Sequence, residues 1–156
     1  MIRIIGIDPG LNKTGWAVVD KIGYDPIYVG SGIIKTSTTH TLPHRLLHLH
    51  TNLNVVIEEF KPNFGAIENT YINKNFGSSL DLSHARAALI LALAANNLDI
   101  SEYQAKTIKK TITGSGAADK DQVCHMLKMM YGNISFNSSD ESDALAIAVT
   151  HCFHLK

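Results

Sequence analysis

The order of strand-like and helix-like segments restricts the possible folds of this chain more than any other feature of its sequence. Three strand-like segments come first, and helix-like and strand-like segments then alternate up to a final helix. The predicted strands span residues 2–8, 15–20, 27–36, 64–68 and 100–103, and the predicted helices span residues 41–60, 78–97, 119–131 and 140–153. This order predicts an α/β fold in which a mixed β-sheet is flanked by α-helices. No linker or internal repeat interrupts it, so residues 1–156 are expected to form a single domain.

Composition places the chain among ordinary globular proteins, because 45% of its residues are hydrophobic and 18% are charged. No apolar run reaches about 18 residues, which predicts no membrane span. The start of the chain reaches an acid at Asp8, too early for a signal peptide. The two cysteines, Cys124 and Cys152, form no CxxC pair and suit a reducing compartment, so we expect a cytoplasmic protein.

Net charge does not identify a partner, since 14 basic residues balance 14 acidic ones. The distribution is more informative, because five lysines and only three acids lie between residues 102 and 128. These lysines are Lys106, Lys109, Lys110, Lys120 and Lys128. Composition alone therefore neither predicts nor excludes binding to nucleic acid.

Acidic residues end two of the predicted strands. Asp8 and Glu68 each follow an apolar run, while Asp140 and Asp143 share one face at the start of the last predicted helix. Ligand sites in open α/β sheets lie beyond the carboxyl ends of the strands, where side chains from different strands converge. Carboxylates are preferred ligands of Mg²⁺, and two such ions about 3.5–4 Å apart can hydrolyse a phosphodiester. The four acids therefore predict a metal-dependent catalytic site.

Each acid also has a purely structural explanation. Asp8 precedes Pro9-Gly10 and could belong only to a turn, and Glu68 could simply end a strand. Asp140 and Asp143 could stabilise the positive end of a helix. Taken singly, each acid fits its structural explanation better than catalysis. Taken together, they favour the metal site, because the structural explanations do not account for two apolar strands that both end in an acid.

The segments around these acids resemble a known family, the RuvC-type Holliday-junction resolvases, in order and spacing from Ile2 to about Cys152. The similar segments are Gly6-Ile7-Asp8-Pro9-Gly10 with Thr14-Gly15-Trp16, Ser31-Gly32-Ile33-Ile34-Lys35-Thr36, Ile67-Glu68-Asn69, Thr113-Gly114-Ser115-Gly116 and Asp140-Glu141-Ser142-Asp143-Ala144-Leu145-Ala146. The resemblance implies a ribonuclease-H-like fold and an endonuclease that resolves four-way DNA junctions in recombination and repair. It further implies a homodimer that works with a branch-migration helicase complex. Its metal ligands would be the four acids, holding two Mg²⁺ ions per subunit with Mn²⁺ as a possible substitute.

The same resemblance suggests residues that hold DNA. Tyr71 matches an aromatic residue at the junction centre, where it could stack on an unpaired base or simply pack its loop onto the core. Lys74 lies in the same loop, and Lys109 and Lys120 match basic positions near the scissile phosphate. The chain departs from the family at Ala117, where a basic residue is frequent, and this puts the DNA affinity in doubt.

The predicted helix at residues 78–97 is apolar almost all round, with Arg86 as the one charge between Ala85 and Ala95. A helix on a sheet needs a single apolar stripe, so we expect a second side to be buried against another copy of the chain. We place this contact at Leu89 and Leu93. The alternative is a central helix that is covered entirely within its own domain.

Other functions share parts of the pattern. A RuvC-like nuclease acting on RNA would have the same fold, and a non-catalytic nucleic-acid-binding module would tolerate loss of acids that are all present here. Actin-like ATPases open with a similar strand and turn, but they need two such domains to enclose a nucleotide. His44 and His48 have a spacing that can bind zinc, but without an HExxH acid or a cysteine partner an exposed helical face is expected.

Overall fold

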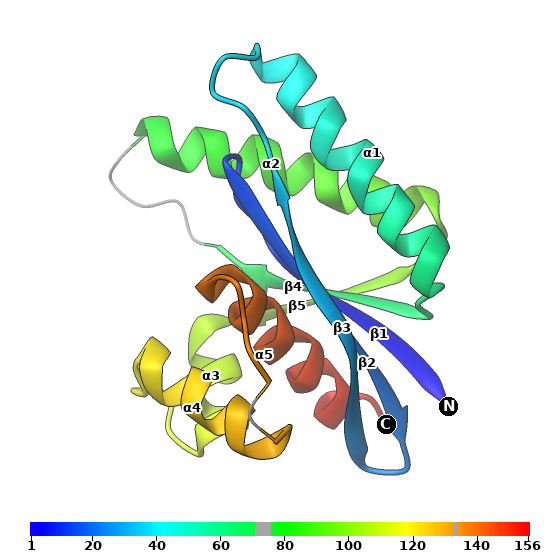
Figure 1. Ribbon diagram of the computed structural model, residues 1–156, viewed down its shortest axis with the longest axis vertical. Helices are drawn as coiled ribbons and strands as arrows, with labels where there is room; N and C mark the ends of the chain where they lie inside the picture. The colour runs from blue at the N-terminus through cyan, green and yellow to red at the C-terminus, as the bar shows by residue number, and fades with distance from the viewer. Residues whose placement is uncertain (71–75, 133) are drawn as a thin grey trace.

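The computed structural model describes residues 1–70, 76–132 and 134–156, which form a five-stranded sheet and five helices (Figure 1). The strands are β1 (Ile2–Asp8), β2 (Lys13–Ile22), β3 (Asp25–Lys35), β4 (Phe64–Asn69) and β5 (Asp99–Gln104). The helices are α1 (Leu42–Phe60), α2 (Phe76–Ala95), α3 (Ala105–Thr113), α4 (Lys120–Met130) and α5 (Ser139–His154). The sheet order is β3-β2-β1-β4-β5, antiparallel from β3 to β1 and parallel from β1 to β5. The predicted mixed α/β sheet is therefore confirmed.

Helices cover both faces of this sheet, with α1 and α2 on one side and α3, α4 and α5 on the other (Figure 1). Alternate residues of β1 pack against the two layers of helices, because successive side chains of a strand point to opposite faces of the sheet. Ile5 and Ile7 are fully buried with α1 and α2, whereas Ile4 is fully buried beneath α5. Burial on both faces explains why the middle of β1 is apolar and why Asp8 appears only where the strand reaches the edge.

Helix α5 packs directly on the backbones of β1 and β2. A Cβ atom on Gly6 would lie 2.3 Å from the carbonyl oxygen of Ala144, and one on Gly15 would lie 2.0 Å from the carbonyl oxygen of Asp140. No side chain fits at these two points, so glycine is required for the close approach. The two glycines therefore set the height of α5 above the sheet and the position of its acidic first turn.

Helix α3 corrects the expectation from the sequence, which predicted no element between residues 104 and 118. The helix has nine residues, and its buried side chains are Ile108 and Ile112. A helix of this length is marginal by itself and depends on tertiary packing, here against α5. Two apolar side chains one turn apart are too few to produce a recognisable periodic pattern.

The connection between β2 and β3 is shorter than predicted, because the sequence placed residues 21–26 between the two strands. The turn lies at Gly23 and Tyr24, with Gly23 at φ +64°, and Pro26 lies inside β3 rather than in the turn. A strand at the edge of a sheet accepts proline, because its missing N–H can fall on the unpaired side.

The prediction that Leu89 and Leu93 of α2 contact a second copy of the chain is wrong. Leu89 and Leu93 are fully buried in the protein's own core, together with Leu49 and Leu53 of α1. The outward face instead carries Ala87 and Leu91, both exposed. A helix that is apolar on all sides gives no signal in its sequence for which side meets the sheet.

Two smaller expectations concern the surface. Within residues 1–70, 76–132 and 134–156, no helix has the length and apolarity needed to cross a membrane. His44 and His48 are exposed on α1, as predicted, and the His44 Nδ1 atom lies 2.8 Å from the Thr41 hydroxyl.

Candidate active site

Asp8 and Glu68 end two adjacent parallel strands. The register pairs Ile7 of β1 with Ile67 of β4, so the two acids follow side by side at the C-terminal ends of these parallel strands. Ile7 and Ile67 are buried on the side of α1 and α2. Because side chains alternate along a strand, Asp8 and Glu68 both face the α5 side. The parallel arrangement therefore brings together two acids that are far apart in the sequence.

The first turn of α5 delivers the other two acids to the same place. Gly15, which pairs with Asp8 across β1 and β2, lies directly beneath the backbone of Asp140. Ser138 caps the helix: its hydroxyl accepts the Asp140 N–H at 3.1 Å and donates to the Asp140 carboxylate at 3.0 Å. Asp143 lies one turn further on. The start of α5 is thereby fixed beside Asp8.

These elements enclose a cavity of about 220 Å³ on the α5 side of the sheet. Asp8, Glu68 and Asp143 line it together with Lys109 of α3 and Lys120 of α4. The remaining lining residues are small or apolar, namely Ala105, Ile108, Val123, Ala146 and Ile147. Asp140 does not line the cavity but lies close enough to raise the pKa of Asp8. The four predicted acids and two of the predicted lysines thus meet at one end of the sheet.

Burial and mutual repulsion raise the pKa values of two of the acids, Asp8 and Glu68. Burial is the main cause that raises the pKa of Asp8 to about 8, followed by the negative charges of Asp143, Glu68 and Asp140. The pKa of Glu68 is also raised, first by burial and then by the charge of Asp143. Lys120 lowers the pKa of both Asp8 and Glu68. A cation placed among these acids would favour their charged forms and relieve the repulsion.

Lysines supply the positive charge already present in the cavity. The Lys120 ammonium donates a hydrogen bond of 2.8 Å to Asp143 Oδ2. This bond is the main cause that raises the pKa of Lys120, while burial acts in the opposite direction. Lys109 faces the same cavity from α3, and its charge lowers the pKa of Glu68.

The donor set suits a hard divalent cation, because the ligating groups in the cavity lining are carboxylates. In the part of the chain that the structure describes, no three Asp, Glu, His or Cys side chains already close around a single point. Asp143 is engaged by Lys120, so a metal ion would replace this lysine as its partner. The carboxylates of the cavity therefore fit a divalent metal ion, and binding of the ion would draw them around a single point.

Glu141 shows that an acid inside the motif need not belong to the cavity. It is 3% exposed, and its carboxylate accepts hydrogen bonds from Ser31 at 3.0 Å and Asn137 at 3.3 Å. These bonds tie α5 to β3, which is a structural role. Two other predicted site residues, Tyr71 and Lys74, lie outside the described residues.

Sequence reasoning missed two features of the site. Gly15 belongs to a motif segment, but the sequence assigned it no role, although it sets the position of Asp140. The Lys120–Asp143 ion pair joins side chains 23 positions apart and had no sequence signal beyond the charges themselves. Gly114, in another of the segments that resemble the family, ends α3 in a left-handed conformation at φ +82°, which explains its presence structurally.

Comparisons with known proteins agree with one another. A family model described as "Crossover junction endodeoxyribonuclease RuvC" matches residues 4–151. Proteins of that name are similar to this chain: one from Rickettsia bellii is 46% identical over 148 residues, 94% of both chains. Another, from Rhodopseudomonas palustris, is 41% identical over 153 residues, 98% of this chain and 88% of the relative.

Solved structures show the same likeness. The structure of T. thermophilus RuvC in complex with a Holliday junction substrate superimposes with a TM-score of 0.91 at 26% identity, covering 99% of this chain and 94% of that chain. The yeast mitochondrial Holliday junction resolvase Ydc2 shares the fold, with a TM-score of 0.72 at 14% identity, over 97% of this chain and 79% of that chain. The expected ribonuclease-H-like architecture is thus confirmed. By its sequence, its fold and its relatives, the chain belongs to the RuvC family of crossover junction endodeoxyribonucleases.

Proposed function

We propose that Asp8, Glu68, Asp140 and Asp143 bind two Mg²⁺ ions per subunit, for which Mn²⁺ can substitute, and that this site cleaves four-way DNA junctions. The observation that carries the proposal is the convergence of four acids from three separate segments, where burial first and the neighbouring negative charges second raise the pKa of Asp8 to about 8. A divalent cation would favour the charged forms of Asp8 and Glu68, whose pKa values are both raised. Metal dependence is typical of RuvC nucleases, and the T. thermophilus relative is solved with a junction.

Divalent ions at this site would supply an activated water and stabilise the oxygen that leaves the phosphorus. The chain's own residues position the DNA for this reaction. If Asp143 held a cation, Lys120 would lose its present partner and would be available to the scissile phosphate. Lys109 approaches the same phosphate from α3. Ile108 and Val123 belong to the apolar part of the lining, which limits the access of bulk water to these charges.

The working unit that we propose is a homodimer built on the outward face of α2. Ala87, Ile90, Leu91 and Ala94 line an open surface cavity of about 480 Å³ there, together with Thr70, Ser83 and Arg86. A closed two-fold dimer would present two identical sites to a junction, which has two equivalent strands to cut. From the family resemblance, we further propose a cytoplasmic location and a branch-migration helicase complex as partner.

A cleavage assay tests the assignment of the acids. A four-way DNA junction, a linear duplex and an RNA hairpin are incubated with the protein in Mg²⁺ or in EDTA. We expect paired nicks in the junction that depend on Mg²⁺. Asp8→Asn, Glu68→Gln, Asp140→Asn and Asp143→Asn should each nearly abolish cutting while junction binding survives, because an amide keeps the shape but loses the charge.

Asp121→Asn serves as the matched control, because this acid is exposed in the first turn of α4 and outside the cavity lining. It should cut like the wild type. Normal turnover in any two of the four variants would contradict the four-carboxylate assignment. Preferential cutting of the RNA hairpin would favour the RNA-directed alternative, and absence of cutting in all substrates would favour a non-catalytic module.

A further inference from the structure

Two lysines face each other across the strands β2 and β3. Lys13 begins β2, Lys35 ends β3, and the register places them directly opposite one another. Both are exposed, and none of the ion pairs within the described residues involves either of them. Like charges directly opposite on antiparallel strands destabilise a sheet. The pair therefore has no evident structural benefit, and its charge is available for a ligand.

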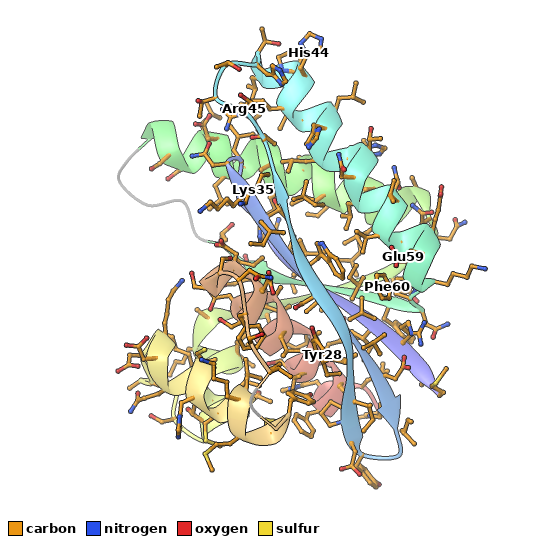
Figure 2. All side chains as sticks on the ribbon, in the orientation of Figure 1. Tyr28, Lys35, His44, Arg45, Glu59 and Phe60 are labelled. Atoms are coloured by element: carbon orange, nitrogen blue, oxygen red, sulfur yellow. The ribbon has the colours of Figure 1, made fainter. Side chains whose placement is uncertain are left out.

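The pair lies on the same face and at the same edge of the sheet as the acids. Gly15 faces α5, so strand alternation directs Lys13, two residues earlier in β2, to the same side. At the end of the sheet Lys13 also lines a surface cavity with Asp81 and Leu82 of α2. Lys35 shares this side because it is paired with Lys13, and Ser31 further along β3 also reaches α5 through Glu141. Figure 2 shows Lys35 near the end of β3 that leads to α1.

At this end of the sheet, the order of side chains across the strands from β3 to β4 is Lys35, Lys13, Asp8 and Glu68. With about 4.8 Å between strands and about 3.4 Å per residue, the Cα atoms of Lys13 and Lys35 lie roughly 8 and 12 Å from that of Asp8. Lys109 and Lys120 lie on the other side of the acids, on α3 and α4. The acidic site is thus bracketed by lysines on both sides.

The backbone that carries the pair is braced. The Thr36 N–H donates to the Asn12 carbonyl oxygen at 3.1 Å, and the Thr36 hydroxyl donates to the Leu11 carbonyl oxygen. Half-buried Arg45 of α1 then donates to both the Thr36 hydroxyl, at 3.0 Å, and the Asn12 side chain. The turn after Asp8 is therefore joined to the end of β3 and to α1. A braced turn presents its lysines with little loss of backbone freedom on binding.

We propose that Lys13 and Lys35 bind backbone phosphates of the junction DNA, on the β3 side of the cleavage site. The net charge of the chain is zero, so attraction for DNA must come from local groups such as these. Lys120 and Lys109 contact the scissile phosphate itself. Lys13 and Lys35 contact other phosphates of the same junction arm, on the β3 side of that phosphate. The inference rests on the proposed function in that it takes the acids as the cleavage site.

Binding measurements in EDTA test this pair separately from cleavage. Affinity for a four-way junction is measured over a range of KCl concentrations for Lys13→Gln, Lys35→Gln and the double variant. Each lysine removed should raise Kd about 5-fold near 0.15 M salt and lower the slope of log K against log [salt] by about one, because one fewer phosphate is neutralised. Lys61→Gln is the control, because Lys61 is an exposed lysine at the C-terminal end of α1, beside the opposite edge of the sheet. It should bind like the wild type.

Further variants distinguish binding from folding. Removing one lysine relieves repulsion, so Lys13→Gln and Lys35→Gln should have a Tm at least as high as that of the wild type. Lys13→Arg with Lys35→Arg should keep both affinity and salt slope. A double glutamine variant that matches Lys61→Gln in Kd and in slope would overturn the proposal. Because no metal is present in this assay, loss of binding in the lysine variants stands even if the acids prove not to be the metal ligands.

Discussion

At the end of β1, Asp8 is buried beside three other carboxylates, and its pKa is raised to about 8. In the unfolded chain, an aspartate titrates at about pH 4. Between these values the folded metal-free protein keeps a proton that the unfolded chain releases. The stabilisation from this proton is therefore complete below about pH 4 and is lost as the pH rises through about 8. Above that pH, cations must provide the stabilisation instead.

Replacing this carboxyl should stabilise the metal-free protein. Asp8→Asn removes the group whose ionisation is disfavoured, so it should raise the Tm at about pH 8 by a few degrees and raise it less at about pH 5.5. Ca²⁺ should raise the Tm of the wild type more at the higher pH and leave Asp8→Asn nearly unchanged. Thermal unfolding followed by circular dichroism measures both effects.

Asp20 provides a control, because its pKa is shifted in the opposite direction from that of Asp8. Arg3 lies 2.7 Å from its carboxylate, and the hydrogen bond from Arg3 lowers the pKa of Asp20. This acid stabilises the fold above about pH 4, so Asp20→Asn should lower the Tm at about pH 8. An Asp8→Asn effect that is identical at both pH values would show that Asp8 is already ionised in the folded protein.

Lys120 should act on the rate of cutting rather than on binding. If it moves from Asp143 to the scissile phosphate, Lys120→Gln should reduce single-turnover cleavage by about 10²-fold, the usual effect of removing one charged group from a transition state. Junction affinity in EDTA should change little, and Lys120→Arg should restore part of the rate. Lys128→Gln, an exposed lysine on the same helix, is the control. Equal losses of affinity and rate would assign Lys120 to binding alone.

At the level of elements, the site depends on how α5 rests on the sheet. The helix carries two of the acids, and its contacts with Gly6 and Gly15 are made through backbone atoms. The buried bonds of Glu141 to Ser31 and Asn137 hold the same turn from the side of β3. The backbone contacts at Gly6 and Gly15 and the bonds of Glu141 therefore position the acidic first turn of α5 over the strand ends.

Gly15→Ala tests this dependence. A methyl group 2.0 Å from the Asp140 carbonyl oxygen forces α5 away from β2, which should lower the free energy of unfolding by about 1–3 kcal/mol. Cleavage should fall more than the remaining folded fraction explains, because Asp140 and Asp143 move relative to Asp8. Activity and denaturant unfolding are measured on the same preparation.

Gly30→Ala, in the neighbouring strand, is the matched control. A Cβ atom there would meet the Phe60 ring at 3.4 Å, an ordinary contact. This variant should keep its activity. If Gly15→Ala were as active as Gly30→Ala, the close packing of α5 would not determine the geometry of the acids.

At the level of the whole molecule, α2 separates the core from the proposed contact between subunits. Its inner side supplies Leu89 and Leu93 to the core, and its outer side leaves Leu91 61% exposed. Small residues around Leu91 would allow the helix of a second copy to approach closely. Such a dimer would give a nuclease of this family two identical sites for two symmetrical cuts.

Leu91→Glu should convert this dimer to a monomer without unfolding it, because the new charge would be buried only in the interface. Leu47→Glu is the matched control, since Leu47 is also 61% exposed and lies on α1. Sedimentation at micromolar concentration should show the monomer for Leu91→Glu alone, with single nicks in place of paired ones. A folded Leu91→Glu variant that remains dimeric would place the contact elsewhere.

The sequence alone was sufficient to predict the mixed sheet and to select the four acids that the structure brings together. Strand periodicity shows which residues end each strand, and the alternation of strands with helices implies that β1 and β4 are parallel. Parallel neighbours end at the same edge, so Asp8 and Glu68 could be placed together without a structure. The acid pair of α5 followed from helical spacing and from the family resemblance.

The remaining features depended on contacts between residues distant in the chain. The short helix α3 is held by packing, and the buried side of α2 could not be read from a helix that is apolar all round. The same holds for the ion pair of Lys120 with Asp143 and for Lys13 opposite Lys35. Local sequence determines periodicity and the ends of elements, but which faces meet is decided by the packing of the whole chain, where each contact depends on all the others.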